Sequence, residues 1–394
     1  MIKLIKSTFF NEPLLKKKLA EFILKTEILS MGSQCQEFEK KFASYQERKY
    51  AVLVNSGSSA NLALIQSLVN LGRLKKGDLV GFSALTWATN TMPLLQTGLI
   101  PIPVDVEIDT LNMSSQTLLK TLKKRKLQAL FITNLLGFCD DIDQIQKICN
   151  DRKILLIEDN CESLGTVYKG KKLGNFSLAS TCSFYVAHHL STIEGGVICT
   201  DDRELANMLK IVRAHGWDRN LDQNTQKNLR KKYKVSDFYS KYTFYDLSYN
   251  LRPTEITGFL GNCQIGLLNQ SNKKRSQNFL RLAKIIYSQE KRYYPMKFDH
   301  IEFLSNFAVP IICKSKQILN DLLNKCSDIL EVRPIEGGDM TEQPFFRKYL
   351  TDANKDLTNP NAKLIHNQGL FFGNNPDLTN QDLDTIIRIF KCKT

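Results

Sequence analysis

Two adjacent histidines, His188 and His189, stand out because the chain has only five histidines. They lie in the segment SFYVAHHLSTIEGG, residues 183–196, and their spacing is not the H-x-x-x-H of a helical zinc pair. Imidazole titrates near neutral pH, so one of them could act as a general base. Two surface histidines with satisfied hydrogen bonds would give the same sequence, and these residues alone leave both interpretations open.

Three further features follow predicted strands, where open α/β sheets bind their ligands. The turn NSGSSAN, residues 55–61, leads into a predicted helix and would present N–H groups to a phosphate. Asp159 ends the run ILLIED, and a carboxylate there could keep a pyridine nitrogen protonated, which makes a pyridoxal-type ring an electron sink. Trp87, in FSALTWATN, could stack on such a ring. The plainer interpretations are an N-cap turn, an exposed acidic loop, and a tryptophan of the core or surface.

These features depend on short apolar runs that we expect to be strands. Most of the runs are almost continuously apolar, which is typical of strands buried on both faces of a mostly parallel sheet. The sequence therefore predicts an α/β fold. The predicted strands are residues 50–55, 79–84, 100–106, 129–134, 154–159, 181–186 and 195–200.

The segments on either side of this region give weaker patterns. Residues 11–26 predict an amphipathic helix with Asn11 as N-cap. The polar stretch at 218–245 predicts a long surface loop near the site. We expect a large domain over residues 1–248 and a smaller domain over 249–394. In the helix predicted at 11–26, the apolar face directed toward a core would comprise Leu14, Leu15, Leu19, Phe22 and Ile23.

Composition argues against several classes of protein. With 394 residues, 42% of them hydrophobic, the chain is long enough for two globular domains. No run of about 18 apolar residues and no signal-peptide pattern occurs, so we expect a cytoplasmic protein without a membrane partner. None of the ten cysteines forms a C-x-x-C pair, so we expect no metal and no iron–sulfur cluster. Cys182 and Cys199 lie in apolar runs and are interpreted as plain buried thiols.

The net charge of +14, from 54 Lys and Arg against 40 Asp and Glu, would attract anions. The basic residues form separate clusters, such as KKRK at 123–126 and KNLRKKYK at 227–234, without a nucleic-acid-binding motif beside them. We therefore expect no nucleic-acid partner. The cluster at 227–234 is the better candidate for contact with a nucleotide diphosphate.

The order of the motifs resembles the DegT/DnrJ/EryC1/StrS family of sugar aminotransferases over about residues 30–270. The resemblance implies the fold type I architecture of aminotransferases that depend on pyridoxal 5′-phosphate (PLP). In that architecture the large domain has a mostly parallel seven-stranded sheet, and the C-terminal domain is smaller. The resemblance also implies a homodimer with shared active sites. The matching segments are NSGSSANLAL, GDLVGFSALTWATN, GLIPIPVDVEIDTLNM, NLLGFCDDID, IEDNCESLG, SFYVAHHLSTIEGG and YNLRPTEITGFLGNCQIGLL.

The same resemblance implies roles for individual residues. Asp159 would pair with the pyridine nitrogen, Trp87 would stack on the ring, and Glu162 would be a polar residue packed by the ring. The residues that would hold the cofactor phosphate are Gly57, Ser58, Ser59 and Ser183, with Asn250 reaching the phosphate of the neighbouring subunit.

One position departs from the family pattern. Ordinary members read S-F-x-x-x-K, and the lysine binds the cofactor covalently; here the pattern starts at Ser183 and its sixth residue is His188. Imidazole cannot form a Schiff base, so the cofactor would be held non-covalently and pyridoxamine 5′-phosphate (PMP) would be the working form. This change resembles the 3-dehydratase branch of the family, which makes 3,6-dideoxysugars.

That branch has two types. One carries a [2Fe–2S] cluster whose cysteines crowd the stretch after a segment like RAHGWDRN, residues 213–220, but no cysteine occurs here from 200 to 262. The resemblance therefore implies the iron-free type, which regenerates PMP from L-glutamate. Its substrate would be a nucleotide-linked 4-keto-6-deoxyhexose, with GDP-4-keto-6-deoxy-D-mannose favoured. Its product would be a 3,6-dideoxy-4-keto sugar for surface polysaccharide.

The expected chemistry centres on His188. It would take a proton from the cofactor carbon C4′, and the protonated imidazole is a reasonable acid for the departing C3 hydroxyl. His189 is a second candidate base, and Arg219 and His215 are candidate substrate contacts. Two alternatives stay open: a PLP-dependent nucleotide-sugar aminotransferase that uses another base, and a lysine-less homologue that binds without catalysis.

Overall fold

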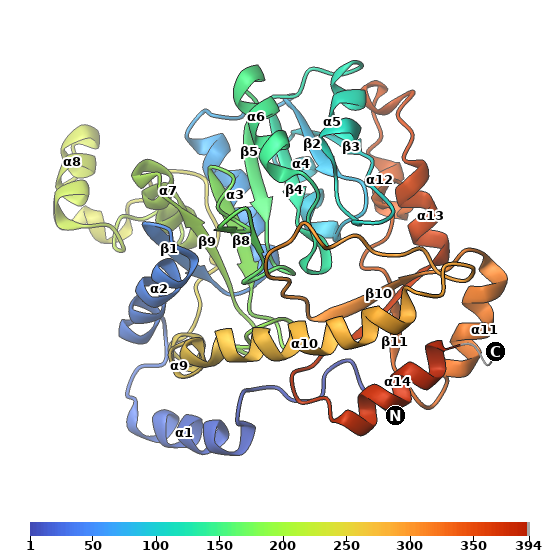
Figure 1. Ribbon diagram of the computed structural model, residues 1–394. Coiled ribbons are helices and arrows are strands. Elements are labelled where there is room, and N and C mark those ends of the chain that lie inside the picture. Colours follow the sequence, from blue (N-terminus) through green and yellow to red (C-terminus); the bar gives the residue numbers. More distant parts are fainter. Residues whose placement is uncertain (392–394) are drawn as a thin grey trace.

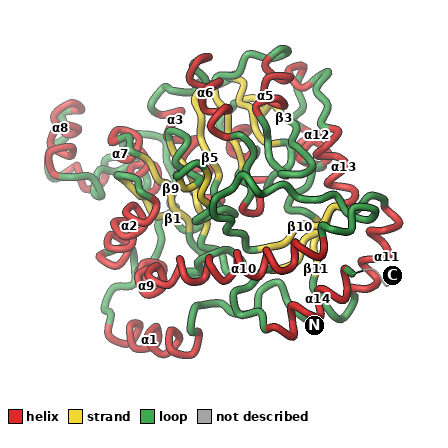
Figure 2. Tube along the Cα trace, in the orientation of Figure 1, coloured by secondary structure: helices red, strands yellow, loops and turns green. Residues whose placement is uncertain are grey.

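A seven-stranded sheet forms the centre of the computed structural model, which describes residues 1–391 (Figures 1 and 2). The strands are β1 (Tyr50–Val54), β2 (Leu79–Ser83), β3 (Ile100–Val104), β4 (Ala129–Thr133), β5 (Leu155–Asp159), β8 (Ala179–Ser183) and β9 (Gly196–Thr200). Their order is β1-β9-β8-β5-β4-β2-β3, and β9 is the one strand of this sheet within residues 1–391 that runs antiparallel to its neighbours. The predicted mostly parallel sheet is confirmed, and every predicted strand overlaps an observed one.

Helices cover both faces of this sheet (Figure 1). In chain order, the α-helices within residues 1–391 are α1 (Glu12–Lys25), α2 (Ser33–Gln46), α3 (Gly57–Asn70), α4 (Met92–Gln96), α5 (Ser115–Leu122), α6 (Ile142–Arg152), α7 (Arg203–Arg213), α8 (Gln223–Tyr233), α9 (Glu255–Gln264), α10 (Leu268–Ile286), α11 (Lys316–Cys326), α12 (Pro344–Lys348), α13 (Pro360–Gln368) and α14 (Asn380–Phe390), and only some of them cover the sheet. Apolar side chains of α3, α4 and α7 pack on one face, and those of α2, α5 and α6 pack on the other. Burial on both faces explains why the strand sequences are continuously apolar.

A second, antiparallel sheet lies in the C-terminal part of the chain. It has the order β10-β12-β11, with β10 (Ala308–Ile312), β11 (Val332–Pro334) and β12 (Gly369–Gly373). Figure 1 shows α10 running beneath the central sheet toward this smaller sheet. Phe279 of α10 meets Phe138 with ring centroids 5.7 Å apart, so one apolar core joins the two parts. A domain boundary between residues 248 and 249 stays a prediction.

The prediction that residues 218–245 form one long loop was wrong. This segment contains α8 and a short 3-10 helix at Tyr239–Tyr242. Asp222 starts α8 by accepting the backbone N–H of Thr225 at 3.0 Å. The helix has no buried residue, so no apolar period marks it in the sequence. It projects away from the body at the left of Figure 1.

The helix predicted at 11–26 is observed as α1 with Asn11 at its N-cap position, but part of the predicted apolar face is exposed. Asn11 occupies the N-cap position with a left-handed backbone, φ 50°, and its side chain makes no capping hydrogen bond. Leu15 is buried against α9, whereas Leu14 and Ile23 are 47% and 40% exposed. Packing within this chain therefore covers only part of the apolar face of α1, and Leu14 and Ile23 stay exposed.

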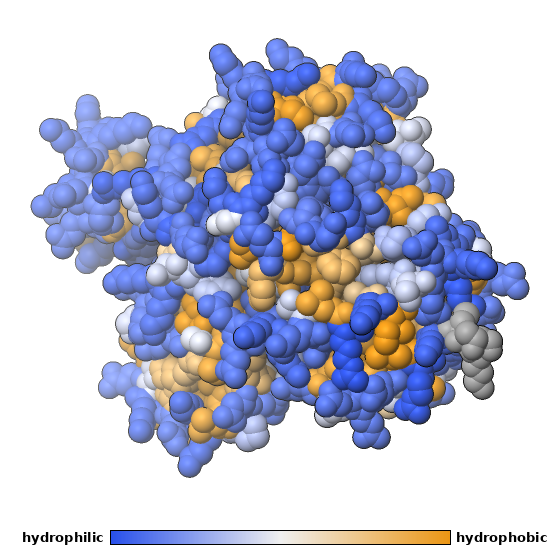
Figure 3. Space-filling view, in the orientation of Figure 1, coloured by the Kyte–Doolittle hydropathy of each residue, from blue (hydrophilic) through white to orange (hydrophobic). Residues whose placement is uncertain are grey.

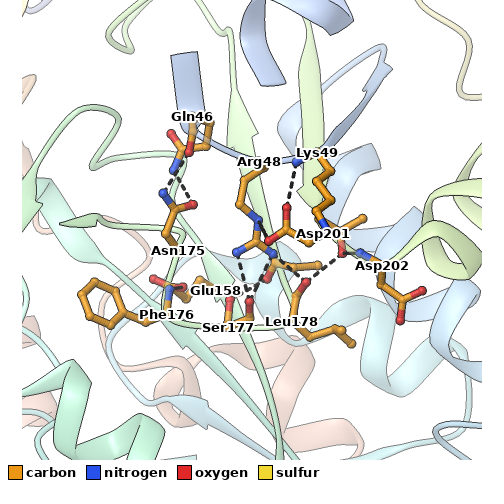
Figure 4. Close-up of polar contacts among 12 residues, drawn as sticks. Gln46, Arg48, Lys49, Glu158, Asn175, Phe176, Ser177, Leu178, Asp201 and Asp202 are labelled. Atoms are coloured by element: carbon orange, nitrogen blue, oxygen red, sulfur yellow. Dashed lines mark hydrogen bonds and ion pairs between the residues drawn. The ribbon is translucent and has the colours of Figure 1, made fainter. Parts of the chain in front are cut away.

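Two side chains fix the start of β8 beside β5 (Figure 4). The buried Glu158 carboxylate accepts the backbone N–H groups of Gly174 at 2.8 Å and Phe176 at 2.9 Å. Arg48 donates to the carbonyl oxygens of Ser177 at 3.2 Å and Leu178 at 2.8 Å. These bonds hold the turn before β8, so the far ends of β5 and β8 lie side by side.

The nine cysteines within residues 1–391 are free thiols, with Cys182 and Cys199 buried as predicted, and Cys392 lies outside the described residues. No cluster of metal-ligand residues occurs in that same part of the chain. Nor does any of its helices have the length and apolar character needed to cross a bilayer.

Candidate active site

A cavity of about 440 Å³ opens at the carboxyl ends of β2, β4, β5 and β8, the edge of the sheet that the sequence indicated. The predicted site residues that line it are Gly57, Ser58, Trp87, Asp159, Glu162, Ser183 and His188. Side chains that we did not predict also line it, among them Ser56, Asn61, Asn90, Arg333 and Glu336.

Asp159 ends β5 with a buried carboxylate that neutral groups hold in place. Its Oδ2 accepts the side-chain amides of Asn61 and Asn90, each at 2.8 Å, and its Oδ1 accepts the backbone N–H of Cys161 at 2.9 Å. Thr181 in turn donates to Asn61 at 2.7 Å. Since these donors are neutral, the charge of the buried carboxylate is left for a cationic partner, and a protonated pyridine nitrogen fits that requirement.

The turn into α3 is built for close approach to β8. The Ser56 hydroxyl caps the helix by accepting the N–H of Ser59 at 3.0 Å and donates to the Ser59 hydroxyl at 2.9 Å. A Cβ on Gly57 would lie 2.6 Å from the Cβ of Ser183, so only glycine fits there. Gly57, Ser58 and Ser183 thus surround the positive end of a helix, an arrangement suited to a phosphate. Ser59 does not line the cavity.

His188 follows β8 and forms part of the cavity wall. Its ring packs against Phe307 and Tyr185, with centroids 5.1 Å and 5.7 Å away. Burial lowers the pKa of His188 to about 4; the charge of Asp159 opposes this shift and that of Arg275 reinforces it. The imidazole is therefore neutral at physiological pH and has a lone pair free to accept a proton.

His189 points away from the cavity. It is 1% exposed, and its Nε2 lies 3.2 Å from the carbonyl oxygen of Ser305. Burial lowers the pKa of His189 well below its ordinary value. Of the two adjacent histidines, only His188 lines the main cavity within the described residues.

Trp87 and Glu162 complete the predicted part of the wall. Trp87 is 49% exposed, so a large ring face is available at the cavity mouth. Glu162 is buried, and its Oε2 accepts the backbone N–H of Leu136 at 2.9 Å. Burial raises the pKa of Glu162 well above its ordinary range, and the nearby Glu336 carboxyl adds to this shift.

Residues 15–391 match the DegT/DnrJ/EryC1/StrS aminotransferase family. The chain belongs to this family. Among known relatives, the GDP-4-keto-6-deoxy-D-mannose 3-dehydratase of Escherichia coli O55:H7 is 34% identical over 395 residues, covering 96% of this chain and 97% of the relative. A protein of the same name from Yersinia pseudotuberculosis is 33% identical, covering 94% of this chain and 93% of the relative.

Solved structures of GDP-4-keto-6-deoxymannose-3-dehydratase share the fold of this family member. A histidine-to-asparagine variant with bound GDP-perosamine superimposes with a TM-score of 0.88 at 30% identity, covering 99% of this chain and 100% of that one. A form with a trapped PLP-glutamate geminal diamine gives a TM-score of 0.86 at 33% identity, with the same coverage. The fold type I architecture predicted from the motifs is therefore confirmed.

Besides Ser59, three residues predicted from the family pattern or its neighbourhood lie outside the cavity of this chain. Asn250 is exposed and accepts the Nε–H of Arg252 at 3.1 Å. Arg219 stacks its guanidinium over Trp217 at 3.9 Å, and His215 packs on the same ring at 4.8 Å between centroids. Within one chain they do not join the site, and their predicted roles stay predictions.

The residues that we missed are of two kinds. Asn61 and Asn90 lie within NSGSSAN and WATN, segments already singled out, but an asparagine there gives no sign that it binds Asp159. Glu336 belongs to the C-terminal part of the chain, and only the tertiary fold brings it to the cavity. The sequence IEGGD around it, with paired glycines, is the one signal that could have drawn attention to it.

Proposed function

We propose that this member of the DegT/DnrJ/EryC1/StrS family is a PLP/PMP-dependent 3-dehydratase of a nucleotide-linked 4-keto-6-deoxyhexose. GDP-4-keto-6-deoxy-D-mannose is the first candidate substrate. The observation that carries the proposal is His188 in the wall of the cavity, at the position where ordinary members carry a lysine. The two relatives named 3-dehydratases, which match nearly the full chain, support the same reaction class.

The cavity residues fit a bound PLP or PMP. Asp159 would pair with the pyridine nitrogen, and Trp87 would cover a face of the ring. Gly57, Ser58 and Ser183 would hold the phosphate at the start of α3, and Ser59 would act through its hydrogen bond to the capping hydroxyl. When bound, the cofactor supplies an amine that condenses with a ketone and a ring that accepts electrons.

His188 supplies the base. Its neutral imidazole would accept a proton from the cofactor carbon C4′, which is the step that sends electrons toward the sugar and expels the C3 hydroxyl. Because imidazole is shorter than a lysine side chain, it would not carry that proton on to the sugar carbon C4 and complete an amino sugar. The released product would hydrolyse to a 3-deoxy-4-keto sugar and ammonia, and L-glutamate would restore the amine while becoming 2-oxoglutarate.

We also propose a homodimer in which Asn250 and Arg219 serve the cavity of the partner chain. Both residues are exposed here, outside the cavity of their own chain, and both carry groups that bind phosphate oxygens. The basic segment at 227–234 lies at the end of α8, which has no buried residue, and its lysines Lys227, Lys231, Lys232 and Lys234 are exposed.

The test is a panel of GDP-, CDP- and dTDP-linked 4-keto-6-deoxysugars, each incubated with the enzyme, PLP and L-glutamate. Mass spectrometry should show loss of the C3 oxygen from the preferred sugar, with one ammonia released for each dehydration. An amino sugar without ammonia would instead identify an aminotransferase. If no sugar of the panel reacts and glutamate does not shift the absorbance from the PLP to the PMP form, the protein is a binding homologue and the proposal fails.

A further inference from the structure

A loop from the C-terminal part of the chain reaches the cavity. Residues 335–339 read IEGGD, and the segment is fastened to the large sheet by the N–H of Met340, which donates to the carbonyl of Ala84 at 2.8 Å. Gly338 has φ +66°, and a Cβ there would lie 2.0 Å from Nδ1 of His366. The glycine therefore allows a packing that other residues would prevent.

This loop places Glu336 against Glu162 across the cavity wall. Glu336 has φ 43°, a left-handed backbone conformation that is uncommon for residues other than glycine. The two carboxyl groups lie within hydrogen-bonding range of each other, and Glu162 also accepts the N–H of Leu136 at 2.9 Å. The second oxygen of Glu336, Oε1, is sealed from solvent and has no hydrogen-bond partner among residues 1–391. A buried polar atom without a partner at a cavity wall is positioned for a ligand.

Two carboxyl groups at hydrogen-bond distance cannot both be ionised without strong repulsion. Burial raises the pKa of Glu336 to about 7 and raises that of Glu162 well above its ordinary range. For Glu336, hydrogen bonding with Glu162 and the charge of Arg333 both lower its pKa and so oppose the effect of burial, whereas the like charge of Asp159 raises it. His188, which also lines the cavity, is neutral. Near neutral pH the pair therefore retains at least one proton.

We propose that the Glu336–Glu162 pair is the acid of the site, with Glu336 donating a proton to the sugar hydroxyl that leaves. This inference rests on the proposed function and deepens it. As His188 removes the proton at C4′, the freed electron pair moves toward the sugar and the C3–O bond breaks. The electrons of that bond stay on the oxygen, which takes the proton of Glu336 and departs as water. The pair gains one negative charge and His188 one proton; once the product has left the cavity, the pair takes up a proton and His188 releases one, so the cycle neither gains nor loses a proton overall.

The first test replaces Glu336→Gln, which keeps the size and hydrogen bonding of the side chain but removes its acidic proton. We expect sugar dehydration to slow by about 10²–10³-fold, while glutamate still converts the PLP form to the PMP form at the wild-type rate. That retained half-reaction shows a folded site. Glu342→Gln is the matched control, because Glu342 pairs with Lys363 and Arg347 outside the cavity and its loss should leave both reactions unchanged.

The second test uses the substrate with fluorine in place of the C3 hydroxyl, since fluoride leaves without a proton. Glu336→Gln should release fluoride as fast as the wild-type enzyme does. If the variant is equally slow with both substrates, or if it dehydrates the natural substrate at the wild-type rate, Glu336 is not the acid. Failure of the proposed function is a separate result, because the wild-type enzyme would then dehydrate no sugar of the panel.

Discussion

At the residue scale, the surroundings of His188 decide what its imidazole can do. Burial among Phe307 and Tyr185 disfavours the charged ring, and Arg275 lies close enough to disfavour it further. The carboxylate of Asp159 has the opposite effect but does not outweigh burial. A lysine in this position would be a nucleophile toward an aldehyde, whereas a neutral imidazole is a base.

The lowered pKa of His188 predicts where activity fails in acid. We expect kcat/KM for dehydration to fall with an apparent pKa near 4, because the imidazole is protonated and inactive below that value. An unfolded imidazole binds a proton below about pH 6.5, so His188 also lowers folding stability as the pH falls from there through its folded pKa. Rates measured across this range, with samples returned to neutral pH to detect denaturation, check the prediction. An acid limb near 6.5, the ordinary pKa of imidazole, would show that burial does not lower the pKa of His188 in the working enzyme.

The substitution His188→Lys should change cofactor binding from non-covalent to covalent. The new amine can bond covalently to PLP, so borohydride reduction should fix the cofactor to the protein, as seen by intact mass. Dehydration with release of ammonia should fall by at least about 10²-fold, since the base is gone. His188→Asn is the matched control, because it also lacks the base but has no amine to bond. Unchanged ammonia release by the lysine variant would contradict the assigned role of His188.

Site residues could be predicted from the sequence where a short motif contains both the strand and the functional group. Asp159 ends one predicted strand and Trp87 comes shortly after another, and the structure places both at the cavity. Asn90 and Glu336 could not be predicted in this way. The first acts through a side-chain amide that is common in turns, and the second comes from a segment far along the chain. Only tertiary packing determines such contacts.

At the element scale, burial determines which elements the sequence can predict. The strands of the central sheet have apolar side chains on both faces, so their runs are easy to recognise. Helix α8 has no buried residue, and its sequence resembles a loop because only the Asp222 cap marks its start. The docking of residues 335–339 against the large sheet depends on contacts between distant segments, which no local pattern records.

The tight packing of that loop predicts the effect of Gly338→Ala. A Cβ would lie 2.0 Å from His366, and alanine also disfavours the φ of +66°. We expect the free energy of unfolding to fall by about 3 kcal/mol, and dehydration to slow because Glu336 is displaced. Gly72→Ala is the control, since its φ of +69° is similar but a Cβ there meets no atom within 4 Å. Denaturant titration of both variants checks this, and equal destabilisation would contradict the packing argument.

At the scale of the whole molecule, the apolar surface is unevenly distributed. Hydrophobic surface is visible over α1 and α9 in Figure 3, and Leu24 of α1 is 86% exposed. Large apolar side chains are also exposed after α8, namely Phe238, Tyr239, Tyr242, Phe244 and Leu247. Exposed patches of this kind mark interaction surfaces, and a second copy of the chain is the partner that we propose.

Sedimentation analysis should therefore give a mass close to twice the 45.1 kDa of one chain. Replacing Phe238 and Tyr242 together by serine should weaken the dimer, because their exposed rings would lose their partner surface. The double substitution Tyr349→Ser and Leu350→Ser is the control, since these exposed residues lie in a different segment. If neither the wild-type mass nor the variants indicate a dimer, the proposed assembly is wrong.

Sharing of sites between chains can be tested by complementation. His188→Asn removes the base, and Asn250→Asp should place a negative charge against the cofactor phosphate of the partner, so each variant alone should be inactive. In a mixed dimer, one site combines both defects, whereas the other combines the intact His188 of one chain with the intact Asn250 of its partner. Random pairing of equal amounts should therefore restore about a quarter of the wild-type sites. If each site were built from one chain, mixing would restore nothing, because every site would keep its own defect. The regained fraction, measured after co-expression, separates a site made by two chains from one that merely lies near an interface.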